Sequence, residues 1–314
     1  MKEAVTDLYR HVAKEIEKQD HRTLWFAFGR SLLAGGQLLT LLATPIISFI
    51  VPVGAYETAK CDELRKASIL CLGGPTEMLL LKRWILITIL VAVVAGVFPR
   101  FTAPLHVWAT FSMSTSFTLP DGGEAIAFII SVLILPLCLI DKRRNHWIID
   151  KTGKTYSSFK KGICYTFSWS LRLQLAFVYL HSSIAKMGVE DWANGSAEYY
   201  IMRDGSFGVA GPLSDFFLSI TFTPWGTLIA SWAAILGGLA IGVGLLLGRH
   251  MRVLSFIVDV AFHIGIILTI GLWSFALVMI GSAALAANTM RKDSGEKLHR
   301  YKFKSENSKD VTDI

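Results

Sequence analysis

The sequence predicts an all-α integral membrane protein, a bundle of about eight transmembrane helices with both termini in the cytoplasm. Of its 314 residues, 53% are hydrophobic and only 18% are charged, and the mean hydropathy is +0.49. These values are typical of membrane proteins and nearly exclude a soluble enzyme. Two further observations support this fold class: a series of long apolar segments, and a few charged residues inside them.

Eight segments are apolar over most of the roughly 20 residues that a helix needs to cross the hydrocarbon core. They are residues 24–48, 78–98, 104–119, 125–140, 163–185, 224–247, 253–272 and 273–287. The third is short, rich in Ser and Thr, and carries His106, so a re-entrant or bundle-interior helix is the alternative there. The last two form one run that would be about 50 Å long as a single helix, so the chain is expected to turn back near Gly271.

Positive charges predict the orientation. Lys and Arg concentrate in the connection 141–162, after the sixth segment and after the eighth, and short cytoplasmic connections carry such an excess. This places both termini inside and the stretch 187–221 outside.

The charged residues that flank the apolar segments also predict the domain boundaries and the kind of partner. Residues 1–22 are a cytoplasmic amphipathic lead-in, 23–290 the transmembrane domain, and 291–314 a disordered basic cytoplasmic tail. The net charge of +7 favours membrane lipids as partners rather than nucleic acid, because the basic residues lie in short connections and not along one stripe.

Two of the four cysteines lie in the first predicted outer connection. Cys61 and Cys71 face the oxidising side of the membrane, whereas Cys138 and Cys164 lie near the reducing inner face. Only the first pair is therefore expected to form a disulfide, most simply as a structural staple. A thiol exchanger acting on a secreted client is the alternative, although the pair lacks the Cys-x-x-Cys spacing of redox enzymes.

A few buried charges interrupt the apolar segments: Arg30, Arg172, Asp259 and His263. Hydrocarbon tolerates such groups only when they are paired or functional. The two arginines and Asp259 lie at similar depths, so we expect Arg172 or Arg30 to pair with Asp259, with His263 on the same helix face as Asp259. Such a buried charge network either fixes the helix packing or serves as a proton relay or the lining of a substrate cavity.

Lys186 ends a helix face on which Arg172, Tyr179 and Lys186 recur every seven residues. A lysine at the outer end of a spanning helix is usually an interfacial anchor. The alternative is a general base, which requires desolvation of the amine. Glu190 and Asp191 follow closely and oppose that role, since nearby carboxylates favour the ammonium form.

Several motifs resemble a known family. Arg172-x-Gln174-x-x-x-x-Tyr179, Lys186 and Asp191-Trp192-x-x-Gly195 resemble the HTTM-like membrane domain shared by vitamin K-dependent gamma-carboxylases and their bacterial relatives. Over nearly the whole chain, the sequence resembles the sporulation-delaying protein B (SdpB) family. The motifs that carry this second resemblance include Arg30-Ser31-Leu32-Leu33, Cys61 with Ser68-Ile69-Leu70-Cys71-Leu72, Pro99-Arg100-Phe101-Thr102-x-x-x-His106, Asp121-Gly122-Gly123 and Asp141-x-Arg143-x-x-His146-Trp147.

The resemblance implies a multi-pass protein of the bacterial plasma membrane that helps to mature a secreted antimicrobial peptide, or bacteriocin. Its partners would be the toxin-peptide precursor and a small protein of the same system. In the hypothesis of a membrane enzyme, the catalytic residues are Lys186 at the outer face with Asp121, His106 and Arg172 nearby. In the carboxylase relatives the lysine at the place of Lys186 deprotonates a reduced quinone, so the resemblance points to a quinone or quinol as cofactor.

Other functions remain open at this point. A non-catalytic scaffold or immunity protein could present the precursor to a separate protease, and the sequence has no His-Glu-x-x-His helix or other metal constellation for cleaving peptides itself. A transporter is the third class, but no inverted repeat supports it. The sequence therefore favours a peptide-modifying membrane component and leaves catalysis undecided.

Overall fold

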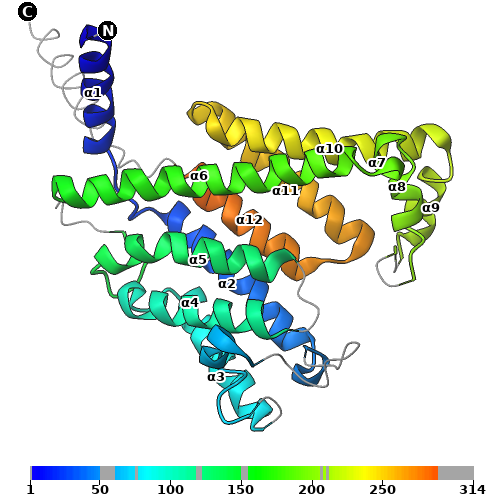
Figure 1. The fold of residues 1–314 in the computed structure, drawn as a ribbon, viewed down its shortest axis with the longest axis horizontal. Helices are drawn as coiled ribbons and strands as arrows, with labels where there is room; N and C mark the ends of the chain where they lie inside the picture. Colours follow the sequence, from blue (N-terminus) through cyan, green and yellow to red (C-terminus); the bar gives the residue numbers. More distant parts are fainter. Residues whose placement is uncertain are drawn as a thin grey trace, which may run out of the picture.

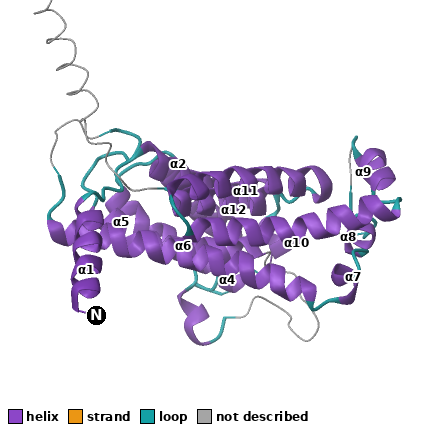
Figure 2. Cartoon of the chain, turned by 90° about the horizontal axis from the view of Figure 1, so that it is seen from above, coloured by secondary structure: helices purple, strands orange, loops and turns teal. Residues whose placement is uncertain are grey.

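The computed structural model of the protein describes residues 2–49, 61–74, 77–117, 122–149, 155–205, 208–209 and 212–288. Within these residues the chain is all-helical and forms no strand (Figure 2). The predicted tail, 291–314, lies outside the described residues. The elements are α1 (Lys2–Glu17), α2 (Leu24–Ala43), η1 (Ile46–Phe49), η2 (Glu63–Ala67), α3 (Leu79–Val94), α4 (Pro99–Ser116), α5 (Gly122–Ile140), α6 (Ser158–Met187), α7 (Glu190–Ala193), α8 (Ala197–Ile201), α9 (Ser214–Ile220), α10 (Pro224–Leu246), α11 (Arg249–Ile270) and α12 (Trp273–Ala287).

Each of the eight apolar segments overlaps one α-helix, in order α2, α3, α4, α5, α6, α10, α11 and α12. Among the described residues, four helices are long and apolar enough to cross a membrane, namely α2, α5, α10 and α11, and α12 is a shorter apolar helix. The protein is therefore an all-helical membrane protein with at least these candidate spans.

The helix ends differ from the predicted segments for local reasons. Helix α2 ends at Ala43, five residues early, because Pro45 cannot donate a helical hydrogen bond. Helix α4 begins five residues early, at Pro99, where proline's fixed φ suits the first helical position. The turn between α11 and α12 lies at Gly271, whose φ of 69° is the left-handed conformation that ends many helices.

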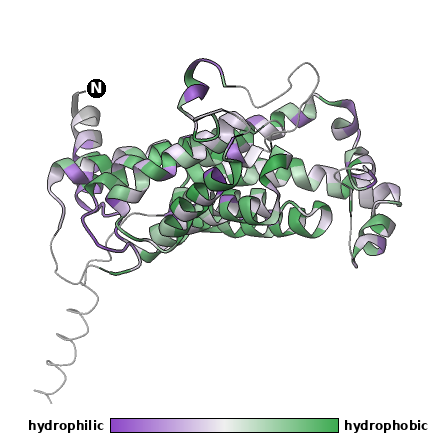
Figure 3. Cartoon of the chain, turned by 90° about the horizontal axis from the view of Figure 1, so that it is seen from below, coloured by the Kyte–Doolittle hydropathy of each residue, from purple (hydrophilic) through white to green (hydrophobic). Residues whose placement is uncertain are grey.

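Helix α12 lies inside the bundle, in contact with α2, α5, α6 and α11 (Figure 1). Helix α6 packs on α10, and α5 on α4. Helix α1 projects from the end of the bundle where α6 begins, whereas α7, α8 and α9 cluster at the opposite end. Hydrophobic residues cover the long helices, and hydrophilic residues gather in the connections at the ends (Figure 3).

Glycines allow α2 and α12 to approach closely. A Cβ at Gly36 would lie 2.7 Å from the backbone oxygen of Ser274, and one at Gly281 would lie 2.6 Å from the backbone nitrogen of Leu33. Small residues at helix contacts serve this purpose in membranes. On α10, Gly238 and Gly242 in the same way leave room for Ser183 and Leu180 of α6. The close contacts of α2 with α12 and of α6 with α10 therefore depend on the absence of side chains at these glycines.

A disulfide and a buried lysine hold the connection between α2 and α3 in place. Cys61 and Cys71 are joined by a disulfide. Lys82 of α3 is buried, and its Nζ donates hydrogen bonds to the carbonyl oxygens of Leu70, at 3.1 Å, and Gly74, at 2.5 Å. The lysine thus fixes the disulfide-closed loop on the end of α3.

Adjacent glycines of α2 provide a matched test of this packing. We expect Gly36→Ala to lower the free energy of unfolding by about 1–3 kcal/mol, because its Cβ meets the α12 backbone. Gly35→Ala should instead raise it by about 0.5–1 kcal/mol, since that position is open and alanine favours the helix. Unfolding in detergent micelles measures both. Equal effects of the two substitutions would contradict the packing argument.

Candidate functional site

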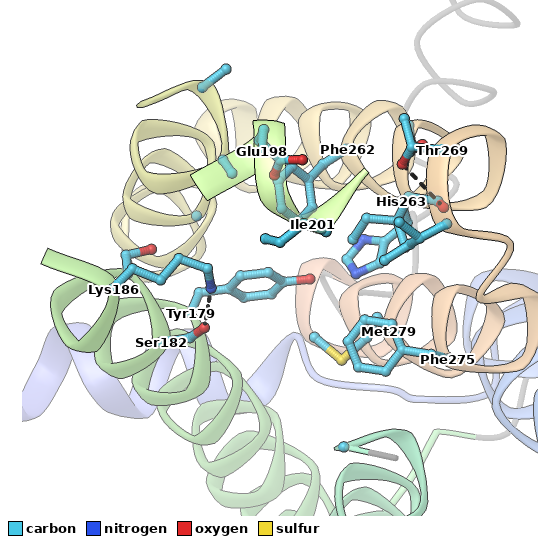
Figure 4. Close-up of a pocket in the computed structure, with 18 of the residues that line it drawn as sticks. Tyr179, Ser182, Lys186, Glu198, Ile201, Phe262, His263, Thr269, Phe275 and Met279 are labelled. Atoms are coloured by element: carbon cyan, nitrogen blue, oxygen red, sulfur yellow. Dashed lines mark hydrogen bonds between the residues drawn. The ribbon is translucent and has the colours of Figure 1, made fainter. Parts of the chain in front are cut away.

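A cavity of about 790 Å³ lies between α5, α6, α10, α11 and α12, with α7 and α8 at one end of it. Its wall is mostly apolar and includes Phe262, Phe275 and Met279 (Figure 4). Its polar side chains include Tyr179, Ser182, Lys186, Glu198 and His263. Ligand pockets in proteins commonly combine apolar walls with a few converging polar groups, so this cavity is the candidate site.

Lys186 lies in the last turn of α6, at the end of the cavity near α7 and α8. Its Nζ donates a hydrogen bond to Ser182 Oγ at 2.9 Å and lies 5.3 Å from the centre of the Trp192 ring. An aromatic face and a nearby carboxylate, here Glu198, favour an ammonium ion, whereas the apolar wall favours a neutral amine. The surroundings of Lys186 therefore exert opposing influences on its charge.

Glu198 of α8 faces the same cavity from outside the long helices. Burial raises the pKa of Glu198 above its usual range, and the Lys186 ammonium partly opposes this rise. The cavity thus holds an amine and a carboxyl group whose charges interact, at the end where α7 and α8 lie.

One serine of α10 positions the segment that carries Glu198. Ser231 Oγ donates to the carbonyl oxygen of Gly195, at 3.0 Å, and accepts from the backbone nitrogen of Glu198, at 3.1 Å. Gly195 has a φ of 84°, and a Cβ there would collide with Leu228 of α10. The Asp191-Trp192-x-x-Gly195 motif therefore has a local cause: only glycine permits this turn to lie against α10.

A second polar group lies deeper in the wall. The Tyr179 hydroxyl donates to Asp259 Oδ1, and His263 Nδ1 lies 3.3 Å from the same oxygen and 2.9 Å from the Asp259 carbonyl oxygen. All three side chains are buried. Figure 4 shows Tyr179 between Lys186 on one side and His263 on the other. This contact joins α6 to α11 and lines the cavity with groups that can hold a proton.

The predicted ion pair between an arginine and Asp259 was wrong. Arg172 instead donates from Nε to the carbonyl oxygen of Ala286, at 3.2 Å, and from Nη2 to that of Asn288, at 3.1 Å. The last carbonyl groups of a helix lack intrahelical partners and carry partial negative charge, so the end of α12 satisfies the guanidinium.

Arg30 also has partners other than Asp259. Its Nη2 donates to Thr102 Oγ1 at 2.9 Å, and its Nη1 lies 3.2 Å from His146 Nδ1. The four residues predicted as one buried charge network therefore occupy three places, and only Asp259 and His263 meet. Similar depth in the membrane does not place two helices face to face.

The structure does not bring the predicted catalytic residues together in one cavity. Lys186 lines the cavity, but His106 of α4 and Arg172 do not. His106 is buried, and its Nε2 has no hydrogen-bond partner among the described residues. Asp121 lies outside the described residues, although Gly122, which follows it, lines the cavity. Within the described chain, no group of three or more His, Cys, Asp or Glu residues could hold a metal ion.

Sequence reasoning missed Glu198. It considered Glu190 and Asp191 as the carboxylates near Lys186, but both are exposed and neither lines the cavity. Proximity along the chain favoured the wrong pair, because the Gly195 turn brings α8 back over the cavity. Tyr179 was placed on the correct face, and its hydroxyl could have been considered as a partner for a buried carboxylate.

A double-mutant cycle tests the contact between α6 and α11. Tyr179→Phe should lower the free energy of unfolding by about 1–3 kcal/mol, because Asp259 loses a donor. Combined with Asp259→Asn, the effects should fall short of additivity by about 0.5–3 kcal/mol. Tyr200→Phe, at an exposed position of α8, serves as the control and should be nearly neutral. Strict additivity would show that the two side chains do not interact.

Glu198 predicts a dependence of stability on pH. Since its pKa is raised in the folded state, the carboxyl group favours folding below its unfolded pKa, near 4.5, and loses this contribution as the pH rises through the folded pKa. Glu198→Gln should therefore gain stability over the wild type as the pH rises from about 4 to about 7. Thermal unfolding across this range measures the gain. Glu190→Gln, at an exposed position of α7, should show the same dependence of stability on pH as the wild type. If the stability profiles of the wild type and both variants run parallel across this range, Glu198 does not contribute this pH dependence.

Comparisons with known proteins give two relatives. The chain is 30% identical over 283 residues to the Uncharacterized protein YitO of Bacillus subtilis (strain 168), an alignment that covers 87% of this chain and 89% of YitO. It is also 30% identical over 280 residues to the Sporulation-delaying protein SdpB of the same organism, covering 85% of this chain and 82% of SdpB. No protein-family model and no solved structure matches the chain.

Proposed function

This chain belongs to the SdpB-like family, and on this premise we propose that it is a membrane component of a sporulation-delaying toxin system that acts on a secreted peptide precursor. The cavity that ends at Lys186 is the observation that carries the proposal. It joins apolar walls, suited to a membrane-associated peptide segment, to polar groups that can bind or modify it. A toxin-peptide precursor and a small protein of the same system would be its partners.

The proposed topology places this cavity at the outer face of the plasma membrane. Eight helices would cross the bilayer, with both termini and the connection 141–162 in the cytoplasm and the disulfide and α7–α9 outside. The distribution of Lys and Arg supports this orientation. Residues 23–290 would form the transmembrane domain and 1–22 the lead-in, which contains α1 at the end of α6 away from Lys186.

In the proposed chemistry, Lys186 is the base that removes a proton from the bound substrate. Ser182 orients the amine, Glu198 accepts or returns a proton at the cavity mouth, and the Tyr179, Asp259 and His263 group fixes the deeper wall. The resemblance of the Lys186 region to the carboxylase membrane domain supports this role. Asp121, beside Gly122 of the cavity wall, is the further candidate. The contacts of Arg172 with the end of α12 support a structural role, and His106 does not line the cavity.

A quinol suits the residues of this cavity. Its ring and tail are apolar, as are the walls contributed by Phe262, Phe275 and Met279, and Lys186 and Ser182 provide polar groups for a ring hydroxyl. When bound, a quinol would supply an acidic hydroxyl for the lysine to deprotonate. The volume of about 790 Å³ lies within the usual range for sites of small molecules.

A non-catalytic scaffold or immunity protein is the second candidate. The Trp192 ring beside Lys186 and the Glu198 carboxylate both favour an ammonium ion, which binds a peptide carbonyl or carboxylate without removing a proton. In this case the protein would present the precursor to a separate protease.

Substitutions of Lys186 separate the two candidates. Loss of a general base should reduce the rate at which mature peptide forms by roughly 10²–10⁴-fold in Lys186→Ala. Lys186→Arg keeps a cation but cannot act as a base, so it should also fail if Lys186 is the base and should succeed if only the charge is needed. Mass spectrometry of the secreted peptide provides the measurement, with the amount of membrane-inserted protein recorded for each variant.

Lys66→Ala is the matched control, because Lys66 is an exposed lysine of η2 that the proposal also places outside. It should yield the wild-type amount of mature peptide. Normal maturation in both Lys186 variants would remove Lys186 from the function. The mass of the secreted peptide should also be compared between cells that have this protein and cells that lack it. A mass difference that cleavage alone does not explain would establish a covalent modification.

A further inference from the structure

A second cavity, of about 380 Å³, lies on the Arg172 side of the bundle, away from Lys186. Helix α6 contributes Trp169 and Arg172, and the first turn of α11 contributes Arg249 and Arg252. Arg172 precedes Lys186 by four helical turns, about 21 Å, and does not line the first cavity. Nothing in the proposed function uses this second site.

Helix α1 covers this cavity. Its Glu15 lines the wall, and Glu17 anchors the helix on α6 by accepting hydrogen bonds from Lys161, at 2.5 Å, and Ser158, at 3.1 Å. The hydrogen bonds from Lys161 and Ser158 lower the pKa of Glu17 below its usual range. The amphipathic lead-in is therefore held over the arginines.

The three arginines are only partly satisfied by the protein. Arg172 donates to the carbonyl groups at the end of α12, and Arg252 Nη1 donates to the Leu247 carbonyl oxygen at 2.7 Å. Arg252 Nε is buried and has no hydrogen-bond partner in the described part of the chain. Arg249 is exposed in the first turn of α11. The exposed guanidinium of Arg249 thus remains available to a ligand at the cavity wall.

The charge of the cavity is strongly positive. Three arginines face one carboxylate, Glu15, which also pairs with Lys18 at 2.6 Å. The cavity also contains the N-terminus of α11, a helix of 22 residues, whose first N–H groups carry partial positive charge. Like charges that share a low-dielectric cavity repel one another, so an anion would lower the electrostatic energy of this site.

We propose that this cavity binds a phosphate group, carried either by an anionic phospholipid or by a free phosphate compound. Guanidinium groups match phosphate oxygens through paired N–H donors. Basic pockets between transmembrane helices on the cytoplasmic side bind anionic headgroups, and the predicted orientation places Arg249 and Arg252 on that side. The phosphate would connect α6, α11 and the covering α1, and would couple the lead-in to the bundle.

Binding to the purified full-length protein in a neutral detergent tests the proposal. Native mass spectrometry can follow titrations with short-chain phosphatidylglycerol, with phosphatidylcholine of the same chain length and with inorganic phosphate. We expect phosphatidylglycerol to bind in preference to phosphatidylcholine. Arg249→Gln with Arg252→Gln should weaken this binding roughly tenfold to thirtyfold, because two phosphate-binding charges are lost.

The control removes two exposed charges outside the cavity, by Lys142→Gln with Arg144→Gln, and should leave binding unchanged. Arg249→Gln alone serves as a second variant, since an exposed side chain can change without loss of the fold. Binding of inorganic phosphate that depends on Arg249 would assign the site to free phosphate compounds. Absence of binding by both probes, or equal losses in the cavity and control variants, would overturn the proposal.

Discussion

The need to satisfy polar groups inside hydrocarbon governs this fold, and the chain meets it largely without classical ion pairs. Arg172 binds the carbonyl groups at the end of α12, Arg30 binds a threonine hydroxyl and lies against a histidine, and Asp259 accepts from Tyr179. Each solution uses a neutral partner, which avoids the desolvation of a second charge. Each also ties two segments that are distant in sequence, so the same contacts that make the charges tolerable set the positions of the helices.

Helix α6 connects these contacts to both cavities. One face of this helix carries Arg172, Tyr179 and Lys186 at seven-residue spacing, and each meets a different neighbour: the end of α12, Asp259 of α11, and the Trp192 ring of α7. The glycines of α10 let that helix pack closely on α6 at Ser183 and Leu180. A displacement of α6 would therefore affect the Arg172 cavity and the Lys186 cavity together, which makes this helix the structural link between the two cavities.

The sequence predicted the helices well, because hydrophobic length is a local property, and Gly271 marked the turn between the last two. It did not predict the partners of the charges. Depth along a helix follows from residue number, but the direction in which a side chain points around the bundle depends on the packing of all helices. Arg172 and Asp259 illustrate this limit. Glu198 illustrates another, since a single left-handed glycine, Gly195, reverses the chain and brings a more distant carboxylate over the cavity.

The charge interaction between Lys186 and Glu198 explains how, in the proposed mechanism, one site could favour both charge states of the lysine. While water fills the cavity mouth, solvent and the Trp192 face stabilise the ammonium. A substrate that excludes water makes both the ammonium and the carboxylate more costly. Transfer of a proton from Lys186 to Glu198 then removes both charges at once, and burial already raises the pKa of Glu198 in that direction. In the proposed mechanism, binding of the apolar substrate would itself generate the neutral amine that can act as a base, so the two opposing influences on Lys186 belong to successive states of one site.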